Sequence, residues 1–442
     1  MTPWRPEADY RTWGRLAAGP HEVARPRFAD EVSPLVRSSI DAPSGMLPAG
    51  LARSYAESGV NPGGRILRMD HLDRFIHFDA ETGVLRAEAG LSLNALLQAA
   101  VPRGWFLNTT PGTRFVTLGG AVANDVHGKN HHRSGTFGAG VRRLGLLRSD
   151  EDGVLELSPQ SNTDLFAATI GGLGQTGTIV WVEVQLVRIA SSWVMQETVP
   201  FGSTDEFLAI AAESEDTHEF VVSWIDCTAP GGPGFFYRSN WCADGDLTPH
   251  AATQKLTLPV DLPAWALNPL TLTSFNRLYG AAQRLKPSAF RVHYNAFFYP
   301  LDAIGGWNRL YGKPGFRQYQ FVTPPETSAD ALKAVLDVIR RSGEGSFLAV
   351  LKTFGTPTSP GLLSFPRPGA TLALDFQNRG EDTLRLFERL DAVVAEAGGR
   401  LYPAKDGRMP AAMFKAGYPN WAAWAARRDP AIQSEFVRRV LQ

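Results

Sequence analysis

Residues 111–132 read PGTRFVTLGGAVANDVHGKNHH, and the chemistry of this stretch decides how the rest of the chain is interpreted. Its first half, Pro111–Gly120, combines small residues, hydroxyl groups and an arginine in a loop whose backbone N–H groups can form a nest for an anion. The earlier segment Gly50–Tyr55, GLARSY, has the same character. Each segment alone is as consistent with an ordinary turn as with a pyrophosphate cradle, so the two together indicate only where an anionic ligand would bind.

The second half of the stretch, Asp125–His132, places three histidines and a lysine within eight residues. A metal site is disfavoured because His131 and His132 are adjacent and no cysteine or carboxylate completes a usual ligand set. A histidine and a lysine beside a redox centre can instead orient a hydroxyl and stabilise charge. We therefore predict a redox site that holds no metal.

A glycine motif further along the chain matches a dinucleotide-binding pattern but lies in the wrong structural context for it. Gly172–Gly177, GLGQTG, fits the GxGxxG signature of Rossmann domains. In those domains a strand precedes the glycines and a helix follows, so that phosphate meets a helix N-terminus. Here a helix-like segment, Asp164–Thr169, comes first and a strand-like segment comes after. A nicotinamide-binding Rossmann site is therefore not expected.

The first 195 residues have an α/β pattern. Ser92 is expected to cap a short helix that ends before Pro102. The alternating segment Ile179–Val187, IVWVEVQLV, predicts a strand. Short β-like runs predict three neighbouring strands at Ile66–Met69, Phe75–Asp79 and Val84–Glu88. Because 442 residues suit two domains, we predict a first domain over residues 1–195 with two α/β subdomains.

Residues 196–395 are predicted to form a second domain. Two amphipathic helices are expected, Ala329–Arg341 and Glu381–Ala397, the latter ended by two glycines. Helices of this kind among many strands are typical of an antiparallel sheet covered on one face, so the whole chain is predicted to be α+β, with residues 396–442 returning to the first domain. The strand-like runs are Phe220–Ile225, Arg291–Phe298, Tyr319–Val322, Phe347–Thr353 and Ala370–Phe376.

Composition excludes several classes of protein. Lys plus Arg and Asp plus Glu are equal at 44 each, so no net field attracts nucleic acid. Cys227 and Cys242 lie in no metal-binding spacing and are predicted to be free thiols. The N-terminus has no apolar run typical of a signal peptide, and the most apolar stretch, Leu256–Leu272, is broken by prolines. We expect a protein that is cytoplasmic or peripheral to the inner membrane.

One loop could contribute to a membrane contact. Pro230–Ala264 is rich in glycine and proline and carries Phe235, Phe236 and Trp241. It is interpreted either as a lid that faces lipid or as a plain surface loop.

The order of these motifs resembles the FAD-binding domain, of the PCMH type, of the vanillyl-alcohol-oxidase superfamily. That order is Arg53-Ser-Tyr55, PGT with VTLGG, HGKNHH at 127–132, and the Gly171–Gly177 loop that feeds a strand. The likeness continues at YQFV (319–322), LKTFG (351–355), LSFP (363–366) and RLYPAKD (400–406), and so covers nearly the whole chain. Within the superfamily the chain is most similar to the branch that oxidises the 2-hydroxyl of a polyprenyl-phosphoryl ribose.

The resemblance implies that the cofactor is FAD. Many members of the superfamily bond their flavin to a histidine of the first loop, whereas this chain has Arg53, Ser54 and Tyr55 there. Non-covalent binding is therefore implied. The positions that match the family's cofactor contacts are Arg53, Ser54, Tyr55, Gly112, Thr113, Thr117, Gly120, Asn124, His127, Gly172, Gly177, Ile179, Tyr402 and Lys405.

The resemblance also implies a pocket for a phosphorylated sugar. Lys405 would lie over the flavin and, with His127, would orient and polarise the reacting hydroxyl; which of the two takes the proton stays open. Lysines suit a phosphate because each supplies a mobile charge with up to three donors, although a single lysine is commonly just a surface charge. The implied substrate-binding positions are Lys129, Gln318, Gln320, Lys352, Phe298 and Tyr55.

Three positions depart from the family's pocket. Ala373 stands where the family has a cysteine, Thr371 where it has an asparagine and Phe298 where it has a tyrosine. Hydride transfer does not need the thiol, so activity is expected to survive this difference. Sensitivity to inhibitors that attack that thiol is expected to be lost.

We therefore expect an FAD-dependent oxidoreductase, a flavoprotein that converts the 2-hydroxyl of a polyprenyl-phosphoryl ribose to the 2-keto sugar. This reaction is the first half of an epimerisation to an arabinose form, the arabinan precursor of cell-wall biogenesis, and an NAD(P)H-dependent short-chain reductase would be the partner that completes it. Two alternatives stay open. One is an FAD-dependent oxidase or dehydrogenase of a free alditol, sugar lactone or other alcohol, and the other is a flavin-binding protein without catalysis.

Overall fold

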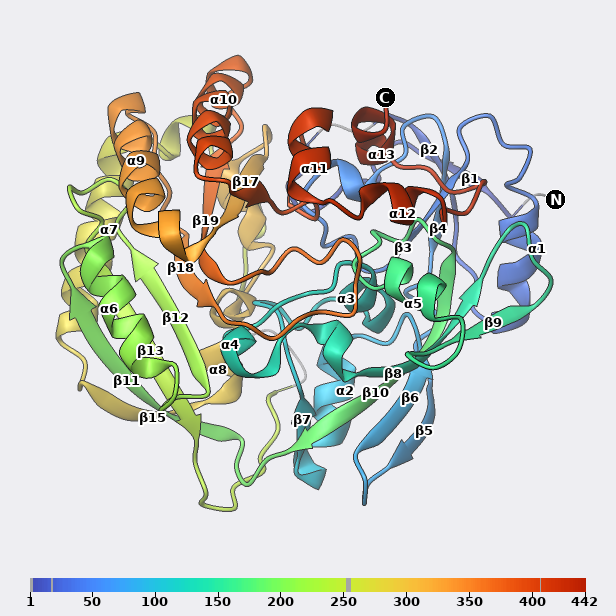
Figure 1. Ribbon diagram of the computed structural model, residues 1–442, viewed down its shortest axis with the longest axis horizontal. Coiled ribbons are helices and arrows are strands. Elements are labelled where there is room, and N and C mark those ends of the chain that lie inside the picture. Colours follow the sequence, from blue (N-terminus) through green and yellow to red (C-terminus); the bar gives the residue numbers. More distant parts are fainter. Residues whose placement is uncertain (1–2, 17–18, 252–255, 406) are drawn as a thin grey trace.

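Sheets of four, six and eight strands organise the chain, joined by one short two-stranded pair (Figure 1). They are seen in a computed structural model that describes residues 3–16, 19–251, 256–405 and 407–442. In Figure 1 the strands of the two smaller sheets occupy the right half of the molecule and those of the largest sheet the left half. The α+β class predicted from the sequence is confirmed.

The four-stranded sheet has the order β1–β2–β4–β3, in which β2, β4 and β3 are parallel. The prediction that β4 neighbours the two strands that follow it was wrong, because β4 pairs with β2 and β3 while β5 and β6 begin the next sheet. Short strands give no local signal of which partner they choose. The strands are β1 (Arg5–Glu7), β2 (His21–Ala24), β3 (Met46–Ala49) and β4 (Arg65–Arg68), and helix α1 (Val32–Arg37) lies between β2 and β3 in the chain.

The six-stranded sheet is built around the long strand β10 (Thr178–Arg188), which pairs with β6, β7 and β8, all antiparallel. The predicted cap of α2 (Leu93–Ala100) is confirmed, because Ser92 accepts a hydrogen bond from Ala95 N–H. α5 (Thr163–Thr169) precedes the glycine loop and β10 follows it, so the predicted order of helix, glycine loop and strand is also confirmed. The other strands are β5 (Phe75–Asp79), β6 (Val84–Glu88), β7 (Trp105–Leu107), β8 (Val141–Leu147) and β9 (Val154–Leu157).

The eight-stranded sheet is antiparallel, in the order β15–β11–β13–β12–β18–β19–β17–β20. The change from one sheet to the next falls between Arg188 and Trp193. Its strands are β11 (Trp193–Phe201), β12 (Phe220–Ile225), β13 (Gly234–Trp241), β15 (Ala289–His293), β17 (Phe316–Thr323), β18 (Ala349–Phe354), β19 (Gly369–Gln377) and β20 (Arg400–Leu401), while β14 (Leu256–Thr257) pairs with β16 (Ile304–Gly305).

Two interpretations of this half of the chain need correction. The predicted strand Arg291–Phe298 is a strand only to His293 and then turns into the short helix α8 (Tyr294–Phe298). The segment Pro230–Ala264 is not one long loop, because Phe235 and Phe236 are buried in β13. Residues 252–255 of that segment lie outside the described residues.

Three helices cover one face of the large sheet, namely α6 (Thr204–Ser214), α9 (Pro325–Ser342) and α10 (Glu381–Glu396). The last two confirm the amphipathic helices predicted from the sequence. Alternate strand residues such as Phe321, Leu351 and Leu372 point into the core beneath them. Because side chains of a strand alternate between its two faces, Gln318 and Gln320 of β17 and Lys352 of β18 point to the opposite face of the sheet.

The chain ends against both halves of the molecule. β20 extends the large sheet, whereas Met46 of β3 forms an isolated bridge with Ile432. The last helices are α11 (Ala411–Gly417), α12 (Trp421–Ala425) and α13 (Glu435–Val440). No helix of the described part of the chain is long and apolar enough to cross a membrane.

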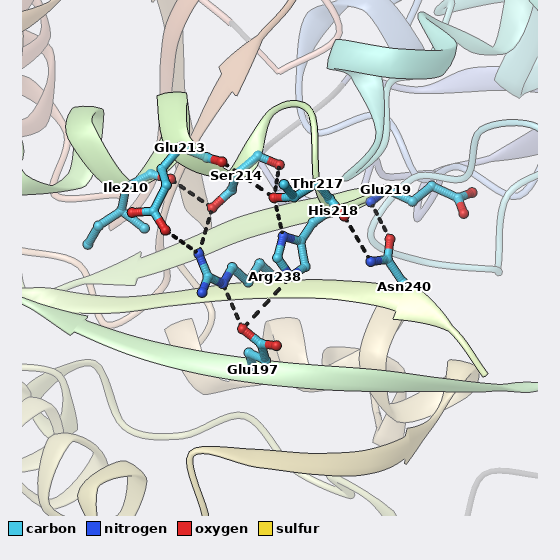
Figure 2. A network of polar contacts seen from close by, with 9 residues as sticks. All are labelled: Glu197, Ile210, Glu213, Ser214, Thr217, His218, Glu219, Arg238 and Asn240. Atoms are coloured by element: carbon cyan, nitrogen blue, oxygen red, sulfur yellow. Dashed lines mark hydrogen bonds and ion pairs between the residues drawn. The ribbon is translucent and has the colours of Figure 1, made fainter.

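A polar network connects the end of α6 and the turn after it to strands β11 and β13 of the large sheet (Figure 2). Arg238 of β13 donates to Glu197 of β11 at 2.8 Å and to Ser214 of α6 at 3.4 Å. The turn after α6 then presents the His218 carbonyl, which accepts from His132 Nε2 at 2.9 Å. The network therefore holds residues 127–132 against the second half of the chain.

Candidate active site

A cavity of about 340 Å³ lies between the loops of the first half of the chain and the face of the large sheet that points away from α9 and α10. Gln318 and Gln320, at alternate positions of β17, and Lys352 of β18 line it. Most of the predicted site residues line it: Arg53, Ser54, Tyr55, Gly112, Thr113, Thr117, Gly120, Asn124, His127, Gly177, Ile179, Gln318, Gln320, Lys352, Tyr402 and Lys405.

Three predicted site residues do not line this cavity. Phe298 is 2% exposed and packs on Phe106 with ring centroids 5.4 Å apart, because α8 turns it into the core. Gly172 is needed for packing, since a Cβ there would lie 2.1 Å from the Ala168 carbonyl oxygen. Lys129 lies outside the cavity wall, where its Nζ donates to the Phe297 carbonyl and lies 4.1 Å from the centre of the Phe297 ring.

The walls of the cavity are built to let a ligand touch the backbone. A Cβ added at Gly112 would meet no protein atom within 4 Å, so this glycine faces open space. Ala52 and Leu173 line the same cavity with φ of 51° and 57°, a region that residues with a side chain seldom adopt. Strained backbone of this kind is held in place by the surrounding fold and gathers at ligand sites.

The loop that carries Gly112 is anchored across the molecule by a buried ion pair. Asp302 accepts from Thr113 Oγ1 at 2.7 Å and from Arg114 N at 2.8 Å, and the Arg114 guanidinium lies 3.5 Å from the same carboxylate. The two side chains are only 3% and 4% exposed. Burial raises the pKa of Asp302, and the hydrogen bonds from Thr113 and Arg114 oppose that rise.

A second buried carboxylate starts the histidine-rich loop. Asp125 has φ of 40°, and its side chain accepts from Gly138 N at 2.8 Å. It also accepts from the hydroxyls of Ser359 and Ser364, each at 2.5 Å. Three bonds to a fully buried group fix the direction in which the chain enters the loop, and with it the position of His127 two residues later.

His127 is enclosed by aromatic rings and by cations. Phe354 and Tyr402 lie 4.9 Å and 5.3 Å from its ring centre, and Gln320 Nε2 lies 3.2 Å from its Nε2. Burial, followed by the charge of Lys352, holds the pKa of His127 well below its usual value. The imidazole is therefore neutral near neutral pH, and its buried Nδ1 has no partner within the described residues.

Three lysines approach one another on this side of the cavity. Burial lowers the pKa of Lys352 to about 7, helped by the charge of Lys405, and lowers the pKa of Lys129 to about 7, helped by Lys352. Lys352 Nζ donates to the Gly128 carbonyl at 3.2 Å. Lys405 Nζ lies 3.7 Å from the centre of the Tyr55 ring, and burial lowers its pKa to about 8. Neighbouring Asp406 lies outside the described residues.

Two groups of the site were missed by the sequence interpretation. Asp375 of β19 is 2% exposed and accepts from Gln318 Nε2 at 2.5 Å, and burial raises its pKa to about 7. Its place in a period-two strand, alternate to Ala373, was the signal that could have found it. Trp13 lies under Arg53 at 3.8 Å, a contact across forty residues that no local pattern announces.

The site residues fit FAD. Glycine-lined walls leave room for a nucleotide to approach the backbone, and the cations Arg53, Lys352 and Lys405 line the same space. Across the described ranges no group of three or more His, Cys, Asp or Glu side chains could hold a metal ion, and Cys227 and Cys242 are both free.

Comparisons with known proteins agree with this geometry. A family model described as "FAD binding domain" matches residues 20–158. The chain is 35% identical to decaprenylphosphoryl-beta-D-ribose oxidase of Mycolicibacterium smegmatis, over 97% of this chain and 96% of that protein. It is 23% identical to L-gulono-1,4-lactone dehydrogenase of Mycobacterium tuberculosis over 97% of each, and 29% identical to cytokinin dehydrogenase 10 of Oryza sativa subsp. japonica over 47% and 40%.

The matched families bind a flavin, and the cavity of this chain has glycine-rich loops on one side and a sheet face with a lysine and glutamines on the other. FAD is its cofactor, and the protein is an FAD-dependent oxidoreductase. The chain belongs to the decaprenylphosphoryl-β-D-ribose oxidase family of FAD-linked oxidoreductases.

Proposed function

We propose that this protein oxidises the 2-hydroxyl of a polyprenyl-phosphoryl ribose to the corresponding 2-keto sugar. The observation that carries the proposal is the pair of Lys352 and Lys405 in the cavity wall, with Lys129 close to Lys352 outside that wall. Each has a pKa well below that of a free lysine because it is buried, and for Lys129 and Lys352 because a neighbouring lysine adds repulsion. An anionic group bound among them relieves that repulsion, so a phosphate-bearing substrate suits this site better than a neutral sugar.

Lys405 has the properties of the proton acceptor. With a pKa of about 8 the amine is partly neutral near physiological pH, which is the range in which a general base works best. His127 stays neutral and can hydrogen-bond the same hydroxyl, while Gln318 is held in position by Asp375. When bound, FAD supplies the hydride acceptor for the carbon that carries this hydroxyl.

Cofactor attachment is proposed to be non-covalent. Arg53, Ser54 and Tyr55 form the part of the wall where a covalent link would need a histidine. The 2-keto product needs a hydride returned to the same carbon for epimerisation to the arabinose form. A separate NAD(P)H-dependent reductase is the proposed partner for that step.

The test is the selectivity of Lys352→Met for phosphorylated substrates. Anaerobic bleaching of the flavin absorbance is followed with a short-chain polyprenyl-phosphoryl ribose and with unphosphorylated ribosides, in the native enzyme and in the variant. We expect a rise in KM of about tenfold or more for the phosphorylated substrate alone, since one charge-assisted contact is lost. Lys333→Met, at an exposed lysine of α9 paired with Asp205, is the matched control.

The competing function is oxidation of a free alditol or sugar lactone, which one relative's name favours. It predicts bleaching by an unphosphorylated substrate and an equal effect of Lys352→Met on all substrates. A flavin that no sugar bleaches would refute both enzymatic functions.

A further inference from the structure

Helix α7 (Pro269–Arg284), at the left of the molecule in Figure 1, presents its apolar face to solvent. Leu270, Leu278 and Leu285, the residue after its last turn, are 76%, 72% and 87% exposed. At about 100° per residue these three side chains fall within an arc of about 80°. They therefore form one continuous apolar edge, which Phe275, 45% exposed, widens. We call these four residues the α7 face.

The side of α7 that packs on the protein carries polar side chains beside the Tyr279 ring, which lies 4.7 Å from Trp224. Asn276 is 2% exposed and donates to Asp226 at 2.7 Å, and Gln283 is 8% exposed. Tyr279 OH lies 3.0 Å from Tyr237 OH of the sheet. An ordinary surface helix turns its apolar stripe inward, whereas Leu270, Leu278 and Leu285 face away from the protein and no element of the described chain covers them.

The turn that leads into α7 extends the same apolar surface. Trp265, in a 3-10 turn over Ala264–Ala266, is 77% exposed. Asn268 caps the helix and also donates to the Trp265 carbonyl at 3.1 Å, which ties this turn to the first residues of α7. An indole next to three leucines is a typical composition of a surface that lies at a membrane interface.

The segment that carries α7 is more basic than acidic. Between residues 256 and 288 the basic residues are Arg277, Arg284 and Lys286, and the one acidic residue is Asp261. Asp261 is already paired with Arg15 at 2.6 Å. Arg277 and Arg284 are seven residues apart and so flank the same side of the apolar edge, where their long stems can keep their charges at the level of lipid headgroups. This surface complements an anionic, apolar layer.

An aromatic path joins the α7 face to the cavity. The Phe275 ring lies 5.5 Å from Phe347, which stacks 5.5 Å from Tyr311. Tyr311 stacks on Phe316 at 4.3 Å, and Phe316 contacts Tyr55, a wall of the cavity, at 5.4 Å. Tyr311 and Phe316 are only 1% and 0% exposed, so this path is a packed core that fixes the position of the α7 face relative to the cavity wall.

We propose that the α7 face, with Trp265 and the flanking Arg277 and Arg284, seats the enzyme on the surface of a bilayer that contains anionic lipid. The membrane contact itself stands on exposure and charge. Its use, to keep a polyprenyl tail in the bilayer while the phosphoribose enters the cavity, rests on the proposed function.

The test is co-sedimentation of the FAD-loaded protein with vesicles of phosphatidylcholine plus phosphatidylglycerol and of phosphatidylcholine alone. The double variant Leu278→Gln, Leu285→Gln is expected to reduce the vesicle-bound fraction, with an apparent affinity lower by about tenfold or more. Arg277→Gln with Arg284→Gln is expected to remove the preference for phosphatidylglycerol. The matched control is Ile76→Gln with Val154→Gln, two exposed apolar residues of the first half of the chain, 52% and 49% exposed, which should bind as the native protein does.

Several results would overturn the proposal. These are failure of the native protein to bind either vesicle, an equal loss of binding in the control, or conversion of a dimer to a monomer by the leucine substitutions with vesicle binding unchanged. The last result would make a second copy of the chain the occupant of the α7 face. Turnover of a short-chain phosphoryl ribose in detergent-free solution is measured in parallel. It should be unchanged in the leucine variant, so a failure of the proposed function is seen separately from a failure of membrane binding.

Discussion

The buried pair of Asp302 and Arg114 offers the sharpest test of how this site is held together. The carboxylate binds the Thr113 hydroxyl, the Arg114 amide and the Arg114 guanidinium. It follows α8 and so connects the second half of the chain to the loop that carries Gly112. Asp302→Ala removes these contacts at once and leaves the Arg114 guanidinium, 3% exposed, without this counter-ion.

Removing one partner of a buried ion pair costs about 3–5 kcal/mol. The entropy of unfolding is about 2.1 cal/mol/K per residue, so a chain of 442 residues that unfolds in one step would lose about 3–5 °C in Tm. Asp302→Asn keeps an acceptor oxygen but not the charge, and its loss should be smaller. Asp205→Ala breaks a pair with Lys333 in which the side chains are 57% and 51% exposed, which is worth about 0–1 kcal/mol.

The assay is thermal unfolding with and without added FAD, followed by intrinsic fluorescence and by release of flavin fluorescence. For Asp302→Ala we expect both the lower Tm and weaker retention of FAD through dilution and gel filtration. If Asp302→Ala melts with Asp205→Ala and holds FAD as the native protein does, then the ion pair does not anchor the loop and the reasoning from burial is wrong.

Two further expectations follow from the same geometry. Gly112→Ala should leave the Tm of the FAD-free protein unchanged, because the added Cβ meets no protein atom within 4 Å. In a titration of flavin fluorescence the same variant should raise the Kd for FAD by about tenfold, which is equivalent to about 1.4 kcal/mol of overpacking. An unchanged Kd would mean that the cofactor does not bind next to Gly112. The pH profile of kcat/KM with the phosphorylated substrate should be bell-shaped. Lys405, with a pKa of about 8, must lose its proton to act as the base, whereas Lys352, with a pKa of about 7, must keep its proton to bind phosphate. Activity should therefore be lost as pH falls below about 7 and as it rises above about 8, and Lys352→Met should remove the alkaline limb; a profile with the alkaline limb intact in that variant would contradict the assignment.

Much of the fold could be predicted because its signals are local. The period of α9 and α10, the serine cap of α2 and the period of β10 all depend on residues within one or two turns of each other. The PGT loop and His127 were assigned to the site through the family resemblance, and both line the cavity. These are the features for which the sequence was sufficient.

What the sequence could not reveal was decided by contacts between distant residues. Phe298 was assigned to the pocket and lies in the core, because a change from strand to helix at His293 depends on packing against Phe106 and Phe220. The amphipathic pattern of α7 does not say which of its faces meets the protein.

The site itself combines both kinds of information. The sequence alone predicted an α/β first half with glycine-rich loops and an antiparallel second half. It also supplied the lysines, in motifs that match a flavin oxidase. Only the tertiary structure brought Lys352 to the Gly128 carbonyl, 224 residues away in the chain, placed Lys405 over Tyr55 and put Asp375 behind Gln318. The physical reason is that burial and mutual repulsion, which tune these groups, exist only once the sheet and the loops have enclosed them.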